Sequence, residues 1–361
     1  MSRLRTVLVG CGKVGRVHAD ALSVLPESAF VAVCDPVRER AEALAQRYRV
    51  EAFVDVAALL RATAPQAVLI ATPHPLHAEP ALAAAEAGAH VLVEKPLAAT
   101  LHDCDAMLDA ARRGGVQLAV ISQRRWYPPV LRMRAAIEAG HIGHPVLGVV
   151  SMFSWRDQAY YESDPWRGRW ETEGGGVLVN QSPHHLDLLQ WLMGEIEEVS
   201  GYWANLNHPY VPVDDTAVAA IRFRGGGLGS LVTSLSQKPG IYAKVHVHGS
   251  NGASVGVQTD TGATFVAGVS GISEPPFNDL WTVPGEEHLL AGFQAADRAA
   301  FQRVDGTSYY HRLQIQEFLQ ALLEGRPAPV PGEEGRRVVA LFTAIYRSQR
   351  EHRPIPFPLD S

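Results

Sequence analysis

The stretch Val7-Leu8-Val9-Gly10-Cys11-Gly12-Lys13-Val14-Gly15 lies near the N-terminus and decides the fold. Its three leading apolar residues predict a buried strand, and the residues after Gly12 predict the start of a helix. Gly10, Gly12 and Gly15 have the spacing of a dinucleotide-binding fingerprint, which allows a tight turn and close approach of the backbone to a pyrophosphate. The helix N-terminus offers N–H groups to the same phosphates. We therefore predict a dinucleotide-binding domain that begins with this stretch.

Short apolar strands alternate with helical segments as far as Ser122. This βαβα order predicts an α/β fold with a doubly wound parallel sheet, the Rossmann arrangement. After Ser122 the pattern changes to strands joined by glycine turns, which predicts an antiparallel or mixed open sheet. The length of 361 residues also favours two domains. We place the dinucleotide-binding domain at 1–122 and the second domain at 123–361, whose terminal helices are able to pack back on the first.

Composition and charge exclude several classes of protein. The formal net charge of −6 argues against a general nucleic-acid-binding protein, which needs a basic face. No apolar run is long enough to span a membrane, and the N-terminus lacks the apolar segment of a signal peptide. The 3 cysteines are widely spaced and include no Cys-x-x-Cys pair, as expected of a reduced chain. We therefore expect a cytoplasmic protein with no nucleic-acid or membrane partner.

Asp35 stands at the predicted end of the second strand, about 20 residues after the last glycine of the fingerprint. Its carboxylate suits a hydrogen bond to a ribose 2′-hydroxyl and would repel a 2′-phosphate, which favours NAD over NADP. Arg38 and Arg40 follow closely and keep NADP open, because either could bind a 2′-phosphate. Asp35 could also cap the next helix, and the two roles are compatible.

The segment from Ala71 to His77 follows another predicted strand and falls beside the expected nicotinamide half of the site. His74 and His77 have the spacing of a metal-binding pair, but no carboxylate or cysteine ligand accompanies them, so we predict no metal. His77 is interpreted as a helix-start residue that makes hydrogen bonds near the cofactor. The residues predicted to bind the cofactor are Gly10, Gly12, Lys13, Val14, Gly15, Asp35, Thr72, Pro73, His74, His77, Glu94 and Lys95.

The tripeptide Glu94-Lys95-Pro96 closes an apolar run, His90–Val93, that predicts a buried parallel strand. Ligands of open α/β sheets bind outside the carboxyl ends of the strands, so Lys95 should face the bound dinucleotide. A lysine whose pKa is lowered by burial or by nearby positive charge can take a proton during hydride transfer. Lys95 is therefore our leading candidate for a catalytic residue, and the alternative is an ordinary surface lysine.

A second candidate site lies in the helix that we predict over Val177–Met193. On one helix, Asn180, His184 and Asp187 share a face, so the histidine would lie beside an amide and a carboxylate. Pro183 would disrupt the helix, and a start just before it would leave Asn180 in the preceding loop. His184 is our second candidate for proton transfer. The alternative is a structural hydrogen bond between His184 and Asp187.

Arginine and aromatic residues gather in two stretches and could form a sugar-binding wall. Aromatic faces pack on sugar C–H groups, and arginines bind hydroxyls or acidic groups. The alternative is that about half of the tryptophans lie in the core or at a subunit contact. The residues predicted to bind substrate are Arg124, Trp126, Tyr127, Trp155, Arg156, Trp166, Arg167, Asn180, His184 and Asp187.

Together these motifs resemble the glucose-fructose oxidoreductase / inositol dehydrogenase / MocA family, usually written Gfo/Idh/MocA. The resemblance implies a Rossmann domain followed by an α/β domain with a large, mainly antiparallel sheet. It implies that the second domain binds a sugar or cyclitol and forms a homo-oligomer, a dimer or tetramer, through its sheet. The stretches that carry it span nearly the whole chain: Gly10–Gly15, Ala71–His77, Glu94-Lys95-Pro96, Gly174–Asp187 and Gly332-Glu333-Glu334-Gly335.

The inositol dehydrogenase pattern has an aspartate at the position where this chain has Asn180. An amide cannot take a proton, so Lys95 and His184 remain for proton transfer. We expect an NAD-dependent oxidoreductase that transfers a hydride between a secondary hydroxyl of a sugar, glycoside or cyclitol and the nicotinamide. Two alternatives stay open, a redox-assisted glycosidase or lyase that uses bound NAD, and a non-catalytic dinucleotide sensor.

Overall fold

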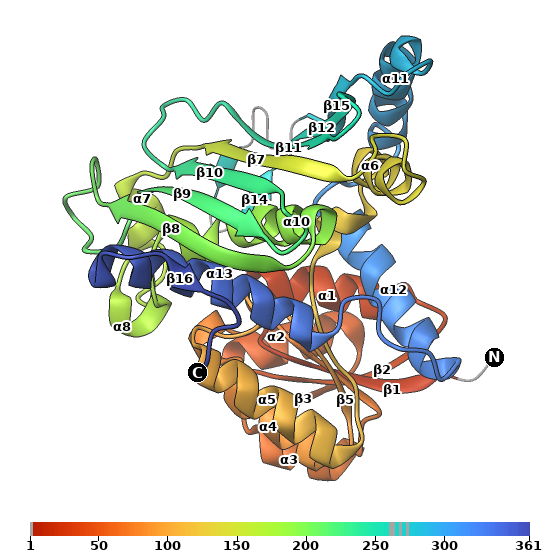
Figure 1. Ribbon diagram of the computed structural model, residues 1–361. Coiled ribbons are helices and arrows are strands. Elements are labelled where there is room, and N and C mark those ends of the chain that lie inside the picture. Colours follow the sequence, from red (N-terminus) through yellow and green to blue (C-terminus); the bar gives the residue numbers. More distant parts are fainter. Residues whose placement is uncertain (1–2, 260–263, 267–268, 272–273) are drawn as a thin grey trace. The chain divides into compact units, whose positions relative to one another are not determined.

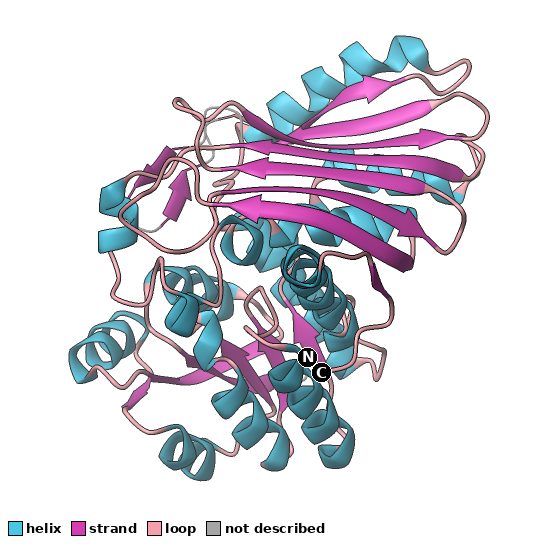
Figure 2. Ribbon diagram, turned by 60° about the vertical axis from the view of Figure 1, so that its left-hand side comes forward, coloured by secondary structure: helices cyan, strands magenta, loops and turns pink. Residues whose placement is uncertain are grey.

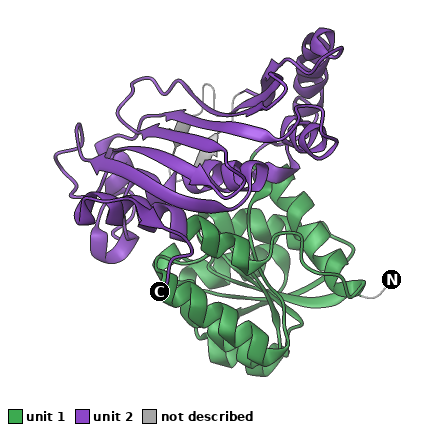
Figure 3. Cartoon of the chain, in the orientation of Figure 1, with its two compact units in different colours: residues 1–123, 307–339, 361 green, residues 124–306, 340–360 purple. Residues whose placement is uncertain are grey.

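The computed structural model describes residues 3–259, 264–266, 269–271 and 274–361. The chain divides into two compact units, which Figure 3 distinguishes by colour. Unit 1 comprises residues 1–123, 307–339 and 361, and unit 2 comprises residues 124–306 and 340–360. The long helix α13 (Gly332–Glu351) contributes residues to both units. No helix within the described residues is both long enough and apolar enough to cross a membrane.

Unit 1 is built on a six-stranded sheet in the order β3-β2-β1-β4-β5-β6. All neighbouring strands in it run parallel, so the predicted doubly wound parallel sheet is confirmed. Parallel strands end at the same edge, and the loops after β1, β2, β4 and β5 therefore share that edge. The strands are β1 (Leu4–Val9), β2 (Ser28–Cys34), β3 (Glu51–Phe53), β4 (Ala67–Ile70), β5 (His90–Val93) and β6 (Leu118–Val120).

Helices cover both faces of the unit 1 sheet (Figure 1). α1 contacts α2 and α12, while α4 contacts α3 and α5. The two sets lie on opposite faces, which is the arrangement that right-handed crossovers produce. The helices are α1 (Lys13–Val24), α2 (Arg38–Tyr48), α3 (Val56–Thr63), α4 (Ala78–Glu86), α5 (Leu101–Gly114) and α12 (Tyr309–Leu323).

Helix α12 follows the first segment of unit 2, residues 124–306, but is part of the core of unit 1. Its Phe318 and Leu319 are fully buried in the apolar cluster that surrounds β1. The side-chain oxygen of Gln314 accepts a hydrogen bond from Ser122 N at 2.7 Å, and its Nε2 donates to Val120 O at 2.8 Å. Both partners lie at the end of β6, so this buried amide fixes α12 against the last strand of the sheet.

Unit 2 has an eight-stranded sheet in the order β15-β12-β11-β7-β10-β9-β8-β16 (Figure 2). Among the described strand pairs of this sheet, β7 and β10 run parallel and the others run antiparallel. The expected large, mainly antiparallel sheet is therefore confirmed. Its strands are β7 (Pro145–Phe153), β8 (Ile196–Ala204), β9 (Thr216–Phe223), β10 (Leu228–Ser234), β11 (Tyr242–Gly249), β12 (Ser254–Thr259), β15 (Phe277–Trp281) and β16 (Ile355–Pro356), and a separate small sheet pairs β13 (Thr264–Val266) with β14 (Val269–Gly271).

One face of the unit 2 sheet carries helices. α10 packs on β7 and β11, and α6 packs on β12 and β15. Buried and more exposed residues alternate along β9 and β11, as expected of a sheet with one covered face. The opposite face presents Tyr202, Val218 and Leu228, which are 68%, 40% and 55% exposed. The helices are α6 (Pro128–Glu138), α7 (Gln158–Glu162), α8 (Trp170–Glu173), α9 (Val177–Asn180), α10 (Pro183–Met193) and α11 (Leu290–Phe301).

The continuous helix predicted over Val177–Met193 is wrong, because the chain forms two helices there, α9 and α10. Pro183 has no N–H to continue the bonding of α9, and it becomes the first residue of α10, a position that proline favours. Asn180 therefore ends α9, while His184 and Asp187 lie on α10. The sequence suggested that the three side chains share one face of a single helix, and in the structure they do not.

Candidate active site

The fingerprint turn between β1 and α1 has one glycine that faces open space. A Cβ added at Gly15 would lie 2.0 Å from Gly10 O, and one at Gly10 would lie 2.6 Å from the carbonyl of Ala71, so both positions exclude larger residues. A Cβ added at Gly12 would meet nothing within 4 Å. The first helical bond of α1 runs from Arg16 N to Gly12 O, so the three amides before Arg16 lack acceptors within the helix. Space and donors for a pyrophosphate therefore coincide at Gly12.

Asp35, at the end of β2, is 5% exposed and holds the fingerprint turn. Its Oδ2 accepts a hydrogen bond from Cys11 N at 2.8 Å, and its Oδ1 accepts one from Val37 N at 2.9 Å. α2 begins at Arg38 with Val37 as its N-cap residue, so a capping role for Asp35 is wrong, and the carboxylate shapes the turn before the cap. Carboxylate oxygens accept more than one hydrogen bond, so Asp35 keeps capacity for a ribose hydroxyl. The residues at this edge fit a dinucleotide.

His77 ties the loop after β4 to the loop after β5. Its Nδ1 lies 3.0 Å from Pro96 O, and its Nε2 lies 3.0 Å from Thr72 O. The neighbouring His74 begins a short 3₁₀ helix, η1 (His74–Leu76), and is buried. Within the ranges that the structure describes, no group of three or more His, Cys, Asp or Glu side chains is arranged to hold a metal ion. His77 therefore fixes the shape of the loop that leads to Lys95.

The carboxylate of Glu94, directly after β5, points to the interior and supports the backbone of Lys95. Its Oε1 lies 2.7 Å from His18 Nε2, and its Oε2 accepts a hydrogen bond from Lys95 N at 3.1 Å. Burial alone would raise the pKa of Glu94, but the hydrogen bond and charge of His18, with His311 and Lys95 nearby, lower it to about 2. Glu94 is therefore a carboxylate at neutral pH, and Lys95, half-buried, is held beside it.

His311 of α12 completes this buried cluster, and no motif in the sequence marked either His311 or His18. Its Nε2 lies 3.8 Å from Glu94 Oε1, and its Nδ1 lies 3.0 Å from Thr307 O. Burial lowers the pKa of His311 to about 4, against the pull of Glu94, which raises it. His311 is therefore neutral at neutral pH, and its ring fills the space behind Glu94 without adding a charge.

In unit 2, Asp214 fixes the start of α9. Its Oδ1 accepts hydrogen bonds from Gly176 N at 2.7 Å and from the Tyr346 hydroxyl at 2.6 Å, and its Oδ2 accepts one from Leu178 N at 3.1 Å. A Cβ added at Gly176 would lie 1.9 Å from Asp214 O, so only glycine fits this contact. The glycine run before α9 is thus a close-packing feature, and it determines where Asn180 at the end of α9 lies.

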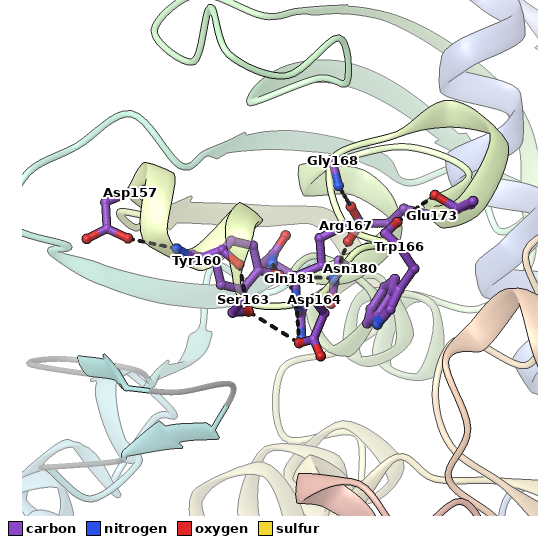
Figure 4. A network of polar contacts seen from close by, with 11 residues as sticks. Asp157, Tyr160, Ser163, Asp164, Trp166, Arg167, Gly168, Glu173, Asn180 and Gln181 are labelled. Atoms are coloured by element: carbon purple, nitrogen blue, oxygen red, sulfur yellow. Dashed lines mark hydrogen bonds and ion pairs between the residues drawn. The ribbon is translucent and has the colours of Figure 1, made fainter. Parts of the chain in front are cut away.

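Asn180 lies in a network of polar side chains that Figure 4 shows from close by. Its Nδ2 donates to Glu173 Oε1 and, at 3.0 Å, to the Tyr160 hydroxyl oxygen. Sequence reasoning chose Asn180 but did not pair it with Glu173 or Tyr160, because only the folding of α7 and α8 beside α9 brings them together.

Asp187 is bound to Arg125, the neighbour of the predicted substrate-binding residue Arg124. Arg125 donates two hydrogen bonds to the Asp187 carboxylate, from Nε to Oδ2 at 2.8 Å and from Nη2 to Oδ1 at 2.5 Å. Both side chains are buried. The Arg125 guanidinium also lies 4.9 Å from the centre of the Trp191 ring. Such a paired buried charge holds α10 against the segment before α6. His184, on the same helix, is 9% exposed.

The remaining predicted substrate-binding residues lie in several places in unit 2. Arg124 Nη1 donates to His185 Nε2 at 2.8 Å, and Arg156 Nη1 donates to Trp155 O at 2.7 Å. Arg167 lies 4.4 Å from the Trp166 ring and lines a cavity of about 440 Å³. Trp126 is half-buried in a 3₁₀ helix, η2 (Gln123–Trp126), and Tyr127 is 2% exposed and precedes α6. Arg167 therefore borders a hollow large enough for a ligand.

We predict that His311 makes the protein less stable in mild acid. The unfolded chain takes up a proton at this side chain near pH 6.5, whereas the folded protein does so only at about pH 4. Stability from the neutral ring is therefore complete above about pH 6.5 and is lost as the pH falls towards 4. Between about pH 7 and about pH 5, protonation of His311 should lower the free energy of unfolding of the wild-type protein by about 2 kcal/mol. The His311→Gln variant should lack this part of the decrease.

The measurement is urea unfolding at both pH values, with His102→Gln as the control, because His102 is exposed on α5. The control should keep the wild-type acid dependence. An acid dependence in His311→Gln equal to that of wild type would contradict the assignment.

Comparisons with known proteins agree with this arrangement. Residues 4–122 match the model "Oxidoreductase family, NAD-binding Rossmann fold", and residues 134–357 match "Oxidoreductase family, C-terminal alpha/beta domain". The chain is 27% identical to myo-inositol 2-dehydrogenase of Thermotoga maritima, over 98% of this chain and 98% of that protein. It is 30% identical to scyllo-inositol 2-dehydrogenase (NAD(+)) of Bacillus subtilis, over 70% of this chain and 73% of that protein.

A solved structure is similar over almost the full length. It is the WlbA dehydrogenase from Bordetella pertussis in complex with NADH and UDP-GlcNAcA, with a TM-score of 0.87, 30% identity and coverage of 99% of each chain. The family matches span both units, and they confirm the resemblance drawn from the motifs. This chain belongs to the Gfo/Idh/MocA family of oxidoreductases, whose N-terminal domain is an NAD-binding Rossmann fold.

Proposed function

We propose that this protein is an NAD-dependent dehydrogenase that acts on a secondary hydroxyl of a sugar, glycoside or cyclitol. The observation that carries the proposal is the shared edge of the unit 1 sheet. The turn open at Gly12, the carboxylate of Asp35 and the loop of Lys95 follow β1, β2 and β5 at this edge. Relatives named as inositol dehydrogenases, at 27% and 30% identity, support a cyclitol or sugar as the substrate.

Bound NAD supplies a hydride acceptor for the carbon that bears the hydroxyl. As that carbon becomes a carbonyl, its oxygen loses a proton, and we assign this proton transfer to Lys95 and His184. One of the two takes the proton, and the other hydrogen-bonds to the oxygen as negative charge develops on it. Glu94 supports Lys95 by binding its backbone N–H from the interior. Asn180 cannot take a proton and suits a hydrogen bond to another hydroxyl of the substrate.

An acidic sugar is a second candidate substrate. Arg167 and Arg169 both line the cavity of about 440 Å³ in unit 2, and arginine binds carboxylates and phosphates through paired hydrogen bonds. The similar WlbA structure is a complex with UDP-GlcNAcA. NADH formation with myo-inositol, scyllo-inositol, neutral glycosides, uronic acids and UDP-GlcNAcA separates the two substrate classes. Formation of no NADH with any member of this panel would contradict the proposed function.

Product analysis also separates dehydrogenation from its two alternatives. A dehydrogenase accumulates NADH and a keto product in equal amounts. A redox-assisted glycosidase or lyase would cleave glycosides without accumulating NADH, because the hydride returns to the sugar. A dinucleotide sensor would bind NAD and leave every compound unchanged. Mass spectrometry of the reaction mixtures distinguishes the three outcomes.

We also propose a homo-oligomer, a dimer or tetramer, that forms through the open face of the unit 2 sheet. The exposed Tyr202, Val218 and Leu228 on β8, β9 and β10 support this, since apolar residues grouped on one face favour association. Val218→Glu should reduce the particle mass measured by light scattering, and Val24→Glu on α1, which is 62% exposed, is the control. A wild-type monomer would contradict the proposal.

We further propose a cytoplasmic location. Cys11, Cys34 and Cys104 are all free and buried, as in chains that do not depend on disulfides. Cell fractionation tests this, and recovery of the protein mainly outside the cytoplasmic fraction would contradict it.

We predict that Lys95→Ala lowers kcat by a factor of at least about 100, the scale of a lost general acid or base. Dissociation constants for NAD should change little, because the fingerprint turn follows β1 and Asp35 follows β2, whereas Lys95 lies in the loop after β5. Lys238→Ala is a matched control, since Lys238 also precedes a proline but is exposed in unit 2. Steady-state kinetics and NAD titration measure the two effects. A near-wild-type kcat in Lys95→Ala would contradict the assignment of Lys95.

A further inference from the structure

Glu173, the last residue of α8, is a buried carboxylate that contacts Asn180. It is 1% exposed, and its Oε2 accepts a hydrogen bond from Gly168 N at 2.5 Å. Its Oε1 accepts a hydrogen bond from Asn180 Nδ2 (Figure 4). A carboxylate has no proton to donate, so it fixes the orientation of the carboxamide with the NH₂ group towards itself.

In this orientation both hydrogens of the Asn180 carboxamide are used. One is donated to Glu173, and the other is donated to the Tyr160 hydroxyl oxygen at 3.0 Å. Arg167 Nη1 also donates to the Tyr160 oxygen at 2.7 Å, and the side-chain amide of Gln181 lies 2.8 Å from it, so the position of the phenol is fixed. A further partner of the carboxamide can therefore only be a donor to Oδ1. A sugar hydroxyl is such a donor.

Charged and titratable groups of several elements face Glu173. Burial raises the pKa of Glu173 to about 7, and the N–H groups of Gly168 and Asn180 and the charge of Arg167 oppose this rise. Asp214 raises it further. The phenols of Tyr160, Tyr161 and Tyr346 are also close enough to sense the charge, and burial raises the pKa of each, so all three stay neutral. Burial also raises the pKa of Asp214. Among Glu173 and the three phenols, Glu173 is therefore the group that changes protonation near neutral pH.

When Glu173 is protonated, Asn180 has to accept a hydrogen bond from it instead of donating one. The neutral acid carries an O–H donor, which would face the NH₂ group of the carboxamide as donor against donor. Turning the carboxamide over places Oδ1 towards Glu173 and resolves this conflict. Tyr160 accommodates either orientation, because a hydroxyl both donates and accepts. The turned carboxamide would then present N–H groups to its further partner in place of an acceptor.

We propose that Glu173 is a positioning residue that acts through Asn180: as a carboxylate it directs Oδ1 to accept a hydrogen bond from a substrate hydroxyl, and as a neutral acid it turns the amide over and weakens substrate binding. The inference rests on the proposed function, since it takes Asn180 as a substrate contact. KM for the substrate should therefore rise as the pH falls through about 7, with a smaller change in kcat.

Two substitutions that exchange the carboxyl group and the amide between positions 173 and 180 test the proposal. In Glu173→Gln the group at 173 is neutral at every pH, so KM should rise about tenfold at about pH 8 and lose its pH dependence. Adding Asn180→Asp returns an acceptor to position 180, and the amide at 173 can donate to it while accepting from Gly168 N. At about pH 8 the double variant should have the same KM as wild type, and this KM should stay constant as the pH falls to about 6.

Glu138→Gln is the control, because Glu138 is the last residue of α6 in the same unit and is exposed. It should keep both the KM and the pH profile of wild type. NAD affinity and thermal-unfolding midpoints measured for all variants show that each is folded. A pH profile in Glu173→Gln identical to that of wild type, or a double variant no better than the single one, would overturn the proposal.

Infrared difference spectroscopy tests the protonation of Glu173 without any substrate. The C=O stretch of a protonated carboxyl should grow in wild type as the pH falls through about 7 and should be missing from Glu173→Gln. Its absence from wild type would overturn the proposal by itself. If the infrared band titrates but no sugar is oxidised, the proposed function fails and the protonation of Glu173 stands.

Discussion

A carboxylate that is buried away from water has to be compensated by hydrogen bonds or by opposite charge, because its desolvation costs several kcal/mol. This chain meets that requirement with backbone N–H groups at each turn that bears a candidate functional residue. Asp35 binds the fingerprint turn, Glu94 binds the N–H of Lys95, Asp214 binds the start of α9, and Glu173 binds the turn before α8. Each loop is therefore held in one conformation by hydrogen bonds to a buried carboxyl group.

Local patterns in the sequence were sufficient to predict most of the fold. The glycine spacing and the alternation of strands and helices determine the unit 1 sheet, because each glycine and each apolar run acts within its own segment. The break between α9 and α10 was also foreseeable, since Pro183 carries its own signal. The continuous helix failed because its apolar pattern runs past the proline unchanged.

Contacts between distant segments could not be predicted in the same way. The pairing of His18, Glu94 and His311 needs α12 to return to unit 1, and no residue type or spacing announces which histidine will lie behind a given glutamate. The contact between Glu173 and Asn180 likewise depends on two short helices that have no amphipathic pattern. Asp35 and Glu94 were chosen from motifs and hold the turns beside them, whereas His18, His311 and Glu173 were left unnoticed.

The resemblance to the inositol dehydrogenase pattern placed a carboxylate at position 180, and this chain has an amide there with a buried carboxylate beside it. A buried carboxyl group is thus kept one hydrogen bond away from position 180. In the proposed mechanism, Lys95 and His184 exchange protons, and Asn180 is a group of controlled orientation. The proposal thus assigns proton transfer to Lys95 and His184 and substrate binding to Asn180.

Direct transfer of hydrogen from the substrate carbon to NAD is the central claim, and isotopic labelling tests it most directly. A sugar or cyclitol that the enzyme oxidises would be prepared with deuterium on the carbon that bears the reacting hydroxyl. The proposed reaction predicts one deuterium on nicotinamide C4 of the NADH, with none released to water, as measured by mass spectrometry and NMR. Unlabelled NADH, or deuterium appearing in the water, would contradict it.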